Sequence, residues 1–373
     1  MKARVQKLFG LTETKLDAIV IATAIYPSVD GSFFWLFDVP TAVFEESVAV
    51  AHPDGELDVY APVLEAGAAN AAAKKDSHVT VHGYRSPTEL ENALKATLGS
   101  AKKIGLNYPG VTAANYTRLK DLLPGSTFVD VGNAMRKARL TKDAQEIERI
   151  QKAAGIGSKV ALEIPGQLKE GMAEPALARE ITYRLMVHGA DGPSFPTVVG
   201  FGPNSAEPHY FPFHLAGPRT LRSGDSIVCD FGAYFGRYAS DITRSFHFGR
   251  RDEELKRVHE KVEEAQQAAL AVISPGVLAK DVHLAAQRVV DASPWKGRFM
   301  HVLGHSVGLS VHDGWWLDIG VDDPLEENMV MTVEPGIYLP GHGGVRIEDD
   351  VVVTRTGYRF LTTAPRGYIE VPA

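Results

Sequence analysis

The chain has 373 residues, of which 45% are hydrophobic and 23% are charged, a balance typical of a globular protein with two domains. Its formal net charge of -7 and pI near 6.0 do not favour nucleic acid as a partner. The single cysteine, Cys229, excludes an intramolecular disulfide, and the apolar run over residues 18–26 is too short to span a membrane. We therefore predict a cytoplasmic protein without a membrane partner.

Residues 1–135 are predicted to form an α/β domain in which strands alternate with helices. The strand-like runs are "DAIVIATAIY", "SFFWLFDV", "SVAVAH", "LDVYAPV", "HVTVHGY", "KIGLNY" and "TFVDV". Pro53-Asp54-Gly55 is a turn signal for a hairpin between two of them. Helices are expected after Ser86-Pro87 and over "AANYTRLKDLL". Catalytic residue types do not cluster here, so we interpret this region as an accessory domain.

Residues 140–373 are predicted to form a second domain, which opens with an amphipathic helix. Its helical stripe of apolar residues consists of Ile147, Ile150, Ala154 and Val160. Thr141 is the expected N-cap of this helix. A matching helix is predicted over residues 252–273 and ends at Pro275-Gly276. Glycine-punctuated strands between and after these helices carry nearly all the residues that suggest chemistry.

The first of two predicted hairpins is "GDSIVCDFGAYFGRYASDITRSFHFG". Each of its strand-like runs carries one aspartate, Asp230 in the first and Asp241 in the second. A two-residue turn at Phe235-Gly236 would place the aspartates directly opposite each other on one face, with β-carbons ~5 Å apart.

The second predicted hairpin is "MVMTVEPGIYLPGHGGVRIEDDVVVT", which carries Glu334 and Glu348. A turn of odd length around Pro340-Gly341-His342 would place these two glutamates opposite each other in the same way. A bulge of one residue would change the register of either hairpin.

Two pairs of opposed carboxylates indicate a cation site. Like charges directly opposite are destabilising, and one such pair is explained equally well by exposed, solvated side chains. Two pairs in one domain favour the cation site, because four carboxylates balance two divalent ions. With one neutral histidine, this ligand set suits Mn²⁺, Fe²⁺ or Co²⁺ better than a sulfur-rich zinc site, with Zn²⁺ as an alternative. Two ions together generate hydroxide at neutral pH and polarise a carbonyl.

The segment Gly304-His305-Ser306-Val307-Gly308 offers two candidate functional residues. It fits the G-x-S-x-G elbow of serine hydrolases, which requires a strand, a tight turn and then a helix. The sequence after Ser306 is instead interrupted by glycines and resembles strands, and a serine nucleophile would leave both carboxylate pairs unexplained. The glycines also argue against a helical His301-x3-His305 zinc pair. We therefore interpret His305 as the fifth metal ligand.

These residues resemble a known family. Asp230, Asp241, His305, Glu334 and Glu348 are similar to the five metal ligands of the pita-bread metallopeptidases, which include methionine aminopeptidase, aminopeptidase P and prolidase. The phrases "DFGAYFGRYASDITR", "GHSVGLSVHD", "VEPGIY" and "GVRIEDDVVVT" match as well. The resemblance implies an α/β (α+β) chain, with a creatinase-like N-terminal domain over 1–135 and a pita-bread catalytic domain over 140–373. It also implies a homodimer.

The resemblance implies a role for each ligand. Asp241 and Glu348 would bridge two divalent metal ions, with Mn²⁺ expected first and Co²⁺, Fe²⁺ or Zn²⁺ as alternatives. Asp230 would bind one ion, and His305 and Glu334 would bind the other. Glu334 would also handle protons for the metal-bridging hydroxide that attacks the scissile carbonyl.

Further residues resemble groups that contact the substrate or the ligands. His209 resembles the family's substrate-side histidine, and His312 the one that steadies the tetrahedral intermediate. Arg346 lies two residues before Glu348, so on a strand both side chains point to one face, where the arginine would orient the carboxylates. Tyr338 is a further candidate for this supporting role.

The sequence departs from the family pattern in three places. The segment from His209 to Asp230 is a few residues longer than usual, which makes His214 a rival of His209. The N-terminal "FFWLFDVP" lacks the family's usual Tyr-Leu-Thr-Gly motif. Several prolidases place an arginine soon after the second histidine, whereas residues 313–333 contain no Lys or Arg. Trp315 and Trp316 occupy that region, either as packing residues or as an apolar rim for longer peptides or the proline ring.

The resemblance predicts a dinuclear-metal Xaa-Pro peptidase that acts on proline-containing peptides. It would hydrolyse the bond preceding a penultimate proline, in the manner of aminopeptidase P, because the expected arginine for a dipeptide's carboxylate is missing. The alternative is an Xaa-Pro dipeptidase (prolidase). A remoter alternative is a creatinase-like hydrolase or a peptide-binding relative, although such relatives typically lose part of the five-ligand set.

Overall fold

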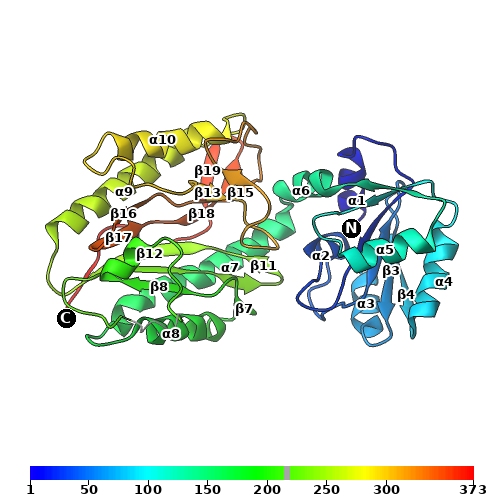
Figure 1. The fold of residues 1–373 in the computed structure, drawn as a ribbon, viewed down its shortest axis with the longest axis horizontal. Helices are drawn as coiled ribbons and strands as arrows, with labels where there is room; N and C mark the ends of the chain where they lie inside the picture. Colours follow the sequence, from blue (N-terminus) through cyan, green and yellow to red (C-terminus); the bar gives the residue numbers. More distant parts are fainter. Residues whose placement is uncertain (214–218) are drawn as a thin grey trace. The chain divides into compact units, whose positions relative to one another are not determined.

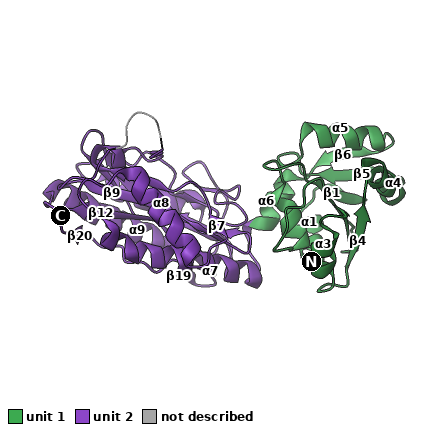
Figure 2. Ribbon diagram, turned by 90° about the horizontal axis from the view of Figure 1, so that it is seen from below, with its two compact units in different colours: residues 1–139 green, residues 140–373 purple. Residues whose placement is uncertain are grey.

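The chain divides into two units, residues 1–139 and residues 140–373, which Figure 2 shows in separate colours. The computed structural model describes residues 1–213 and 219–373, so the rival histidine His214 lies outside the described residues. Among the described residues, no helix has both the length and the apolar content needed to cross a membrane.

The first unit contains a six-stranded mixed sheet with the strand order β4-β3-β2-β1-β5-β6. Its strands are β1 (Ala18–Ala22), β2 (Val48–Ala51), β3 (Leu57–Pro62), β4 (Val79–Tyr84), β5 (Lys103–Leu106) and β6 (Thr127–Asp130). Its helices are α1 (Lys2–Gly10), α2 (Gly31–Phe37), α3 (Ala66–Ala73), α4 (Pro87–Leu98), α5 (Ala113–Leu122) and α6 (Gly132–Leu140). The predicted hairpin is confirmed, because β2 and β3 pair antiparallel around Pro53-Asp54-Gly55.

The predicted strand "SFFWLFDV" is wrong, because residues 31–37 form helix α2. Asp30 caps this helix by accepting a hydrogen bond from the backbone N–H of Ser32 at 2.8 Å. The aromatic side chains are buried around the helix, and the ring of Phe33 lies 5.4 Å from that of Phe44. Aromatic residues favour strands, but a short segment that is apolar all round carries no periodicity to separate the two states, and here burial decides.

The second unit is larger and contains several short sheets. Its strands are β7 (Gly192–Pro193), β8 (Val198–Phe201), β9 (Ser226–Phe231), β10 (Ala233–Phe235), β11 (Tyr238–Ala239), β12 (Ile242–Phe248), β13 (Gly304–His305), β14 (Trp316–Leu317), β15 (Val330–Val333), β16 (Gly336–Leu339), β17 (Gly343–Arg346), β18 (Asp349–Thr354), β19 (Gly357–Phe360) and β20 (Glu370–Val371). Its helices are α7 (Ala144–Glu163), α8 (Glu174–Val187), α9 (Glu253–Val272) and α10 (Ala279–Asp291), with 3-10 turns η1 (Ile164–Gln167) and η2 (Gly202–Ala206).

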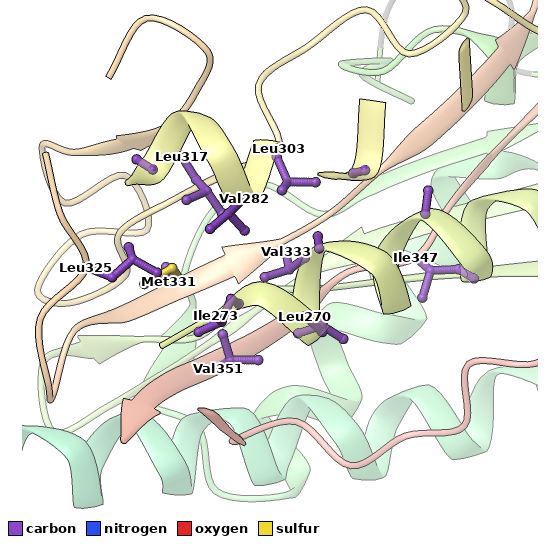
Figure 3. Packing of buried hydrophobic residues seen from close by; sticks show 14 of the residues in the cluster. Leu270, Ile273, Val282, Leu303, Leu317, Leu325, Met331, Val333, Ile347 and Val351 are labelled. Atoms are coloured by element: carbon purple, nitrogen blue, oxygen red, sulfur yellow. The ribbon is translucent and has the colours of Figure 1, made fainter. Parts of the chain in front are cut away.

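Two helix pairs cover the strands of the second unit from different sides. The cluster on one side joins α7 and α8 to strands β8, β9 and β12. The cluster on the other side joins α9 and α10 to strands β15 to β18, and Figure 3 shows its side chains interlocking, among them Leu270, Val282, Met331 and Val351. In Figure 1, α9 and α10 lie along one side of the strands and α8 along the opposite side. Both hairpins that carry the predicted ligands lie between these helices.

The two long helices differ in how well their starts were predicted. Helix α9 begins after Asp252, as expected, and this aspartate accepts hydrogen bonds from the first turn. Helix α7 is capped by Asp143, not by the predicted Thr141, and Asp143 and Glu146 form a reciprocal capping box. Thr141 instead forms a β-bridge with Met329.

Two histidines, His247 on β12 and His259 on α9, are buried against each other. His259 Nε2 donates to the carbonyl of Arg366 at 2.8 Å, so its Nδ1 faces His247 Nε2 at 3.4 Å as an acceptor. The His247 ring also stacks on Tyr368, with centroids 4.1 Å apart. Burial lowers the pKa of His247 to about 3 and lowers the pKa of His259 as well. Both imidazoles are therefore neutral in the folded protein.

We expect acid to destabilise the second unit through these two histidines. Below pH ~6.5 the unfolded chain binds protons that the folded chain excludes, so the unfolding free energy falls by up to about 1.4 kcal/mol per pH unit for each histidine. In His247→Phe, which keeps a ring against Tyr368, urea unfolding between about pH 6 and pH 5 should show a slope shallower by about one proton. His188→Phe, which removes a partly exposed histidine in contact with Glu163 at 2.8 Å, is the control that should not flatten it. Equal slopes in His247→Phe and the wild type would contradict the assignment.

Candidate metal centre

A cavity of about 550 Å³ in the second unit brings the predicted site residues together. Its lining includes all five predicted ligands and three further predicted site residues: Asp230, Asp241, His305, Glu334, Glu348, His209, His312 and Arg346. These residues come from segments far apart in the sequence, so the fold assembles the site from both hairpins and from the His305 strand.

The first hairpin has a different register from the predicted one. Strands β9 and β12 pair Asp230 with Thr243, not with Asp241. The reason is that the two-residue turn is Gly236-Arg237, with φ of 56° and 71°, one residue later than predicted. Moving the turn by one residue moves the pairing by two, so Asp241 is a diagonal neighbour of Asp230. A shift of two keeps both aspartates on the same face, and both still reach the cavity.

The second hairpin has the predicted register. Val333 pairs with Asp349 in the β15–β18 ladder, and Gly336 pairs with Arg346 in the β16–β17 ladder. Glu334 and Glu348 occupy the opposed positions between these two ladders, just outside the strands. The odd-length turn around Pro340-Gly341-His342 is confirmed, with Gly341 at a φ of +78°.

The distances among the predicted ligands fit a cation between them. His305 Nε2 lies 3.6 Å from Asp241 Oδ2 and 3.4 Å from Glu334 Oε1. One ligand atom each of Asp241, His305 and Glu348 lies within 4.8 Å of the others. Two ligands that each lie about 2.1 Å from one tetrahedral ion are about 3.4 Å apart. The two separations from His305 Nε2 are therefore close to those of atoms that share an ion.

Electrostatics at the site also fit bound cations. Burial, with added repulsion from Glu348, Asp230 and other carboxylates, raises the pKa of Asp241 well above its usual range. Burial likewise raises the pKa of Glu348, and it raises that of Glu334 to about 8. Among the described residues, Asp230 Oδ1 and Asp241 Oδ1 are buried without a hydrogen-bond partner. Buried acceptors and like charges are costly unless compensated, and divalent cations compensate both.

His305 is prepared to act as a neutral nitrogen ligand. Burial lowers its pKa to about 3, with a further contribution from His312. Its Nδ1 faces the carbonyl of Ser306 at 3.4 Å as a donor, which leaves the lone pair on Nε2 for a cation.

Arg346 connects the two hairpins. Its Nη2 donates to Asp230 Oδ2 at 2.6 Å, and its Nε donates to Thr243 Oγ1 at 3.0 Å. The Thr243 hydroxyl in turn donates to Glu348 Oε2 at 2.5 Å. Arg346 thus holds one carboxylate directly and another through a threonine. Its Nη1 also donates to the hydroxyl of Tyr338 at 3.0 Å, so Tyr338 contacts the arginine and is not itself among the ligands.

The two tryptophans have separate surroundings. Trp315 is only 3% exposed and belongs to the hydrophobic core beside α9 and α10. Trp316 is 42% exposed and lines the cavity, where its ring lies 5.1 Å from that of His312. The packing interpretation therefore holds for Trp315, and the rim interpretation fits the position of Trp316.

Residues 148–355 match metallopeptidase family M24, and residues 4–141 match the creatinase/prolidase N-terminal domain. The chain belongs to metallopeptidase family M24. The predicted fold class, a creatinase-like N-terminal α/β domain followed by a pita-bread domain, is confirmed.

Several relatives of this M24 peptidase match it over nearly their whole length. An Xaa-Pro dipeptidase of Pyrococcus furiosus is 32% identical over 370 residues, which cover 98% of this chain and 99% of that protein. The structure of an X-Pro aminopeptidase from Thermotoga maritima has 32% identity and a TM-score of 0.88, with coverage of 99% and 100%. An Xaa-Pro dipeptidase structure from Bacillus anthracis has 26% identity and the same TM-score of 0.88, with 99% of each chain covered.

The M24 site gives Ser306 no role as a nucleophile. The residue is fully buried, and its hydroxyl has no hydrogen-bond partner among residues 1–213 and 219–373. It forms a β-bridge with Met331, and the next element is strand β14, not the helix of a serine-hydrolase elbow. The fold therefore supports the choice of His305 over its neighbour.

Two threonines and a histidine of the M24 site were missed from the sequence. Thr243 joins Arg346 to Glu348, and Thr332 donates to Glu334 Oε1 at 3.1 Å while accepting from the His305 amide at 3.0 Å. Thr243 lies two residues from Asp241, and Thr332 lies two residues from Glu334. Side chains two residues apart on a strand point to the same face, and this spacing was the signal that could have identified both threonines. His301 lines the cavity and contacts the Tyr338 hydroxyl at 2.9 Å.

We expect the metal content of the M24 site to depend on His305 and not on Ser306. After incubation with Mn²⁺ and dialysis, elemental analysis of the wild type should find about two ions per chain. Ser306→Ala should match it, whereas His305→Ala should lose at least one ion because a ligand is removed. Unchanged metal content in His305→Ala, with loss in Ser306→Ala, would contradict the geometry.

We expect Thr243→Val to weaken the M24 site although the valine has nearly the same shape. Without the hydroxyl, Glu348 Oε2 loses a donor and Arg346 Nε loses its acceptor, so Mn²⁺ affinity or turnover should fall roughly 10- to 100-fold. Titration with Mn²⁺ measures the affinity. Thr80→Val, at an exposed position of β4, is the matched control and should leave it unchanged. Identical Mn²⁺ affinities in both variants would show that the Thr243 hydroxyl does not support metal binding.

Proposed function

We propose that this M24 metallopeptidase is an Xaa-Pro peptidase that hydrolyses the bond preceding a penultimate proline. The observation that carries the proposal is the complete set of five ligand residues on one cavity. Non-peptidase relatives were expected to lose part of that set. The names of the relatives, Xaa-Pro dipeptidase and X-Pro aminopeptidase, support the proline specificity.

In this proposal the five ligand residues hold two divalent ions, of which Mn²⁺ is the first candidate. Bound there, the ions would lower the pKa of water and polarise the scissile carbonyl. Asp241 and Glu348 would contact both ions, and Asp230 would hold one of them. His305 and Glu334, whose ligand atoms lie 3.4 Å apart, would hold the other.

The remaining residues of the cavity act on protons and on the substrate. Glu334 accepts the proton of the attacking water and returns it to the leaving amine. His312 lies beside His305, with ring centroids 4.3 Å apart, and can donate to the oxygen of the tetrahedral intermediate. His209 borders the same cavity and binds the peptide from the substrate side. Arg346 keeps the Asp230 carboxylate oriented through their 2.6 Å contact.

The charges around the cavity favour peptides longer than a dipeptide. Among the described lining residues, Arg346 is the only Lys or Arg, and its nitrogens are used by Asp230, Thr243, Tyr338 and the carbonyl of Pro208. Residues 214–218 contain no Lys or Arg. A dipeptide would place its free carboxylate here without a cation, whereas a longer peptide places an uncharged amide. We therefore favour an activity similar to that of aminopeptidase P.

The second candidate function is that of an Xaa-Pro dipeptidase. It is favoured by the Pyrococcus furiosus relative, which carries that name and aligns over 98% of this chain. The two functions share the metal site and differ in the group that follows proline.

We expect a tripeptide Xaa-Pro-Yaa with an amidated C-terminus to be hydrolysed with a kcat/KM at least about ten-fold above that of Gly-Pro. The reason is the cost of leaving the dipeptide's carboxylate without a charged partner. Chromatography of the products measures both rates. EDTA should abolish both activities and Mn²⁺ should restore them. A peptide with alanine in place of proline is the specificity control.

Preference for Gly-Pro would instead establish the dipeptidase. Hydrolysis that resists EDTA, or equal rates on the alanine control, would contradict the proposed function altogether.

A further inference from the structure

Glu174 is a fully buried carboxylate outside the cavity that collects hydrogen bonds from one long segment. It is the first residue of α8. Its two oxygens accept from four donors spread along residues 201–219: Phe201 N at 2.8 Å, Asn204 Nδ2 at 3.0 Å, Tyr210 Oη at 2.8 Å and Arg219 N at 3.0 Å. One side chain therefore joins the start, the middle and the end of this segment.

The surroundings of Glu174 explain how it remains buried. A carboxylate excluded from water needs donors, and hydrogen bonds to a charged acceptor are stronger than neutral ones. The first turn of α8 adds the positive end of a helix dipole. The guanidinium of Arg219 pairs with Asp225 at 2.6 Å, so this residue reaches Glu174 through its backbone amide. The carboxylate thus serves as an acceptor for the segment and makes no contact with the cavity.

His209 lies between two anchor points of this segment. The carbonyl of Pro208 accepts from Arg346 Nη1 at 3.1 Å, beside the Asp230 carboxylate. The hydroxyl of Tyr210 donates to Glu174 and accepts from Asn204 Nδ2 at 2.9 Å. The residues on both sides of His209 are therefore fixed, one to the site and the other to α8. His209 itself lines the cavity and is exposed.

We infer that Glu174 is a positioning residue that holds His209 against the substrate. The inference rests on the proposed function, because it gives His209 a substrate to bind. Glu174 anchors Tyr210, the residue directly after His209, together with Phe201 and Arg219. Residues anchored in this way have fewer conformations to lose when a substrate binds. The carboxylate acts through Tyr210 and does not touch the reacting atoms.

The test compares Tyr210→Phe and Glu174→Gln with the wild-type holoenzyme. The phenylalanine keeps the ring and removes the hydroxyl, while the glutamine keeps the shape and replaces one acceptor by a donor. Tyr183→Phe removes a tyrosine hydroxyl from an exposed position of α8, the helix that begins with Glu174, and is the matched control. Two quantities are measured: the hydrogen–deuterium exchange of amides 201–213, and kcat and KM for an Xaa-Pro peptide.

Both variants should exchange amides 201–213 faster, while Tyr183→Phe exchanges like the wild type. The kcat/KM should fall about ten-fold or more in each variant, with metal content unchanged, because a misplaced group costs rate without loss of the metal. In a His209→Ala background, Tyr210→Phe should have almost no further effect, since the residue it positions is gone.

Three results would overturn the inference. Unchanged exchange in Tyr210→Phe would show that the tether, the hydrogen bond from Tyr210 to Glu174, does not restrain residues 201–213. Faster exchange with unchanged kinetics would show that it does not position His209. Effects that add fully to those of His209→Ala would show that Glu174 acts elsewhere. A wild type that cleaves no Xaa-Pro peptide would instead reject the proposed function, and the exchange experiment would still decide whether the tether exists.

Discussion

The repulsion among the four carboxylates of the cavity, Asp230, Asp241, Glu334 and Glu348, is the constraint on which the second unit depends. These groups gain nothing from the hydrophobic core, and burial raises the pKa of Asp241, Glu334 and Glu348. The surrounding structure must hold them together in the absence of attraction among them. It does so with strands on both sides and with one cation, Arg346, which touches Asp230 directly and reaches Glu348 through Thr243.

A second buried network fixes the backbone beside the ligands. Asp349, which follows Glu348, pairs with Arg244 at 2.7 Å and with Arg366 at 2.6 Å. Arg244 also donates to the backbone carbonyl of Glu348 at 2.5 Å. Because Arg244 belongs to the strand of the first hairpin, this network joins both hairpins to the C-terminal segment. Its opposite charges lie in direct contact, so it can supply rigidity without a metal.

The two hairpins differ in how well the sequence predicted their register. The odd-length turn of the second hairpin left one arrangement, and the structure has it. In the first hairpin, Gly236 can supply a positive φ both to a turn at Phe235-Gly236 and to a turn at Gly236-Arg237. The structure has the second turn, in which Arg237 adopts a φ of 71°, a conformation that arginine rarely adopts. Helix α2 was not predicted because residues 32–37 are all buried, so no helical period of apolar and polar residues is visible in the sequence. Thr243 and Thr332 were not predicted because threonine is common in strands and their partners lie far away in sequence.

The neighbouring residues Trp315 and Trp316 lie in different surroundings, one in the hydrophobic core and the other on the cavity. Successive side chains of an extended segment point to opposite sides, so Trp315 enters the core and Trp316 enters the cavity. Trp316 gives the cavity an apolar lining, and the guanidinium of Arg346, the one Lys or Arg of the described cavity wall, pairs with Asp230. Because the nitrogens of Arg346 are used by groups of the site, this arginine is not available to a substrate carboxylate in the proposed function. In this chain, one arginine therefore enters both the charge balance of the candidate metal centre and the proposed preference for longer peptides.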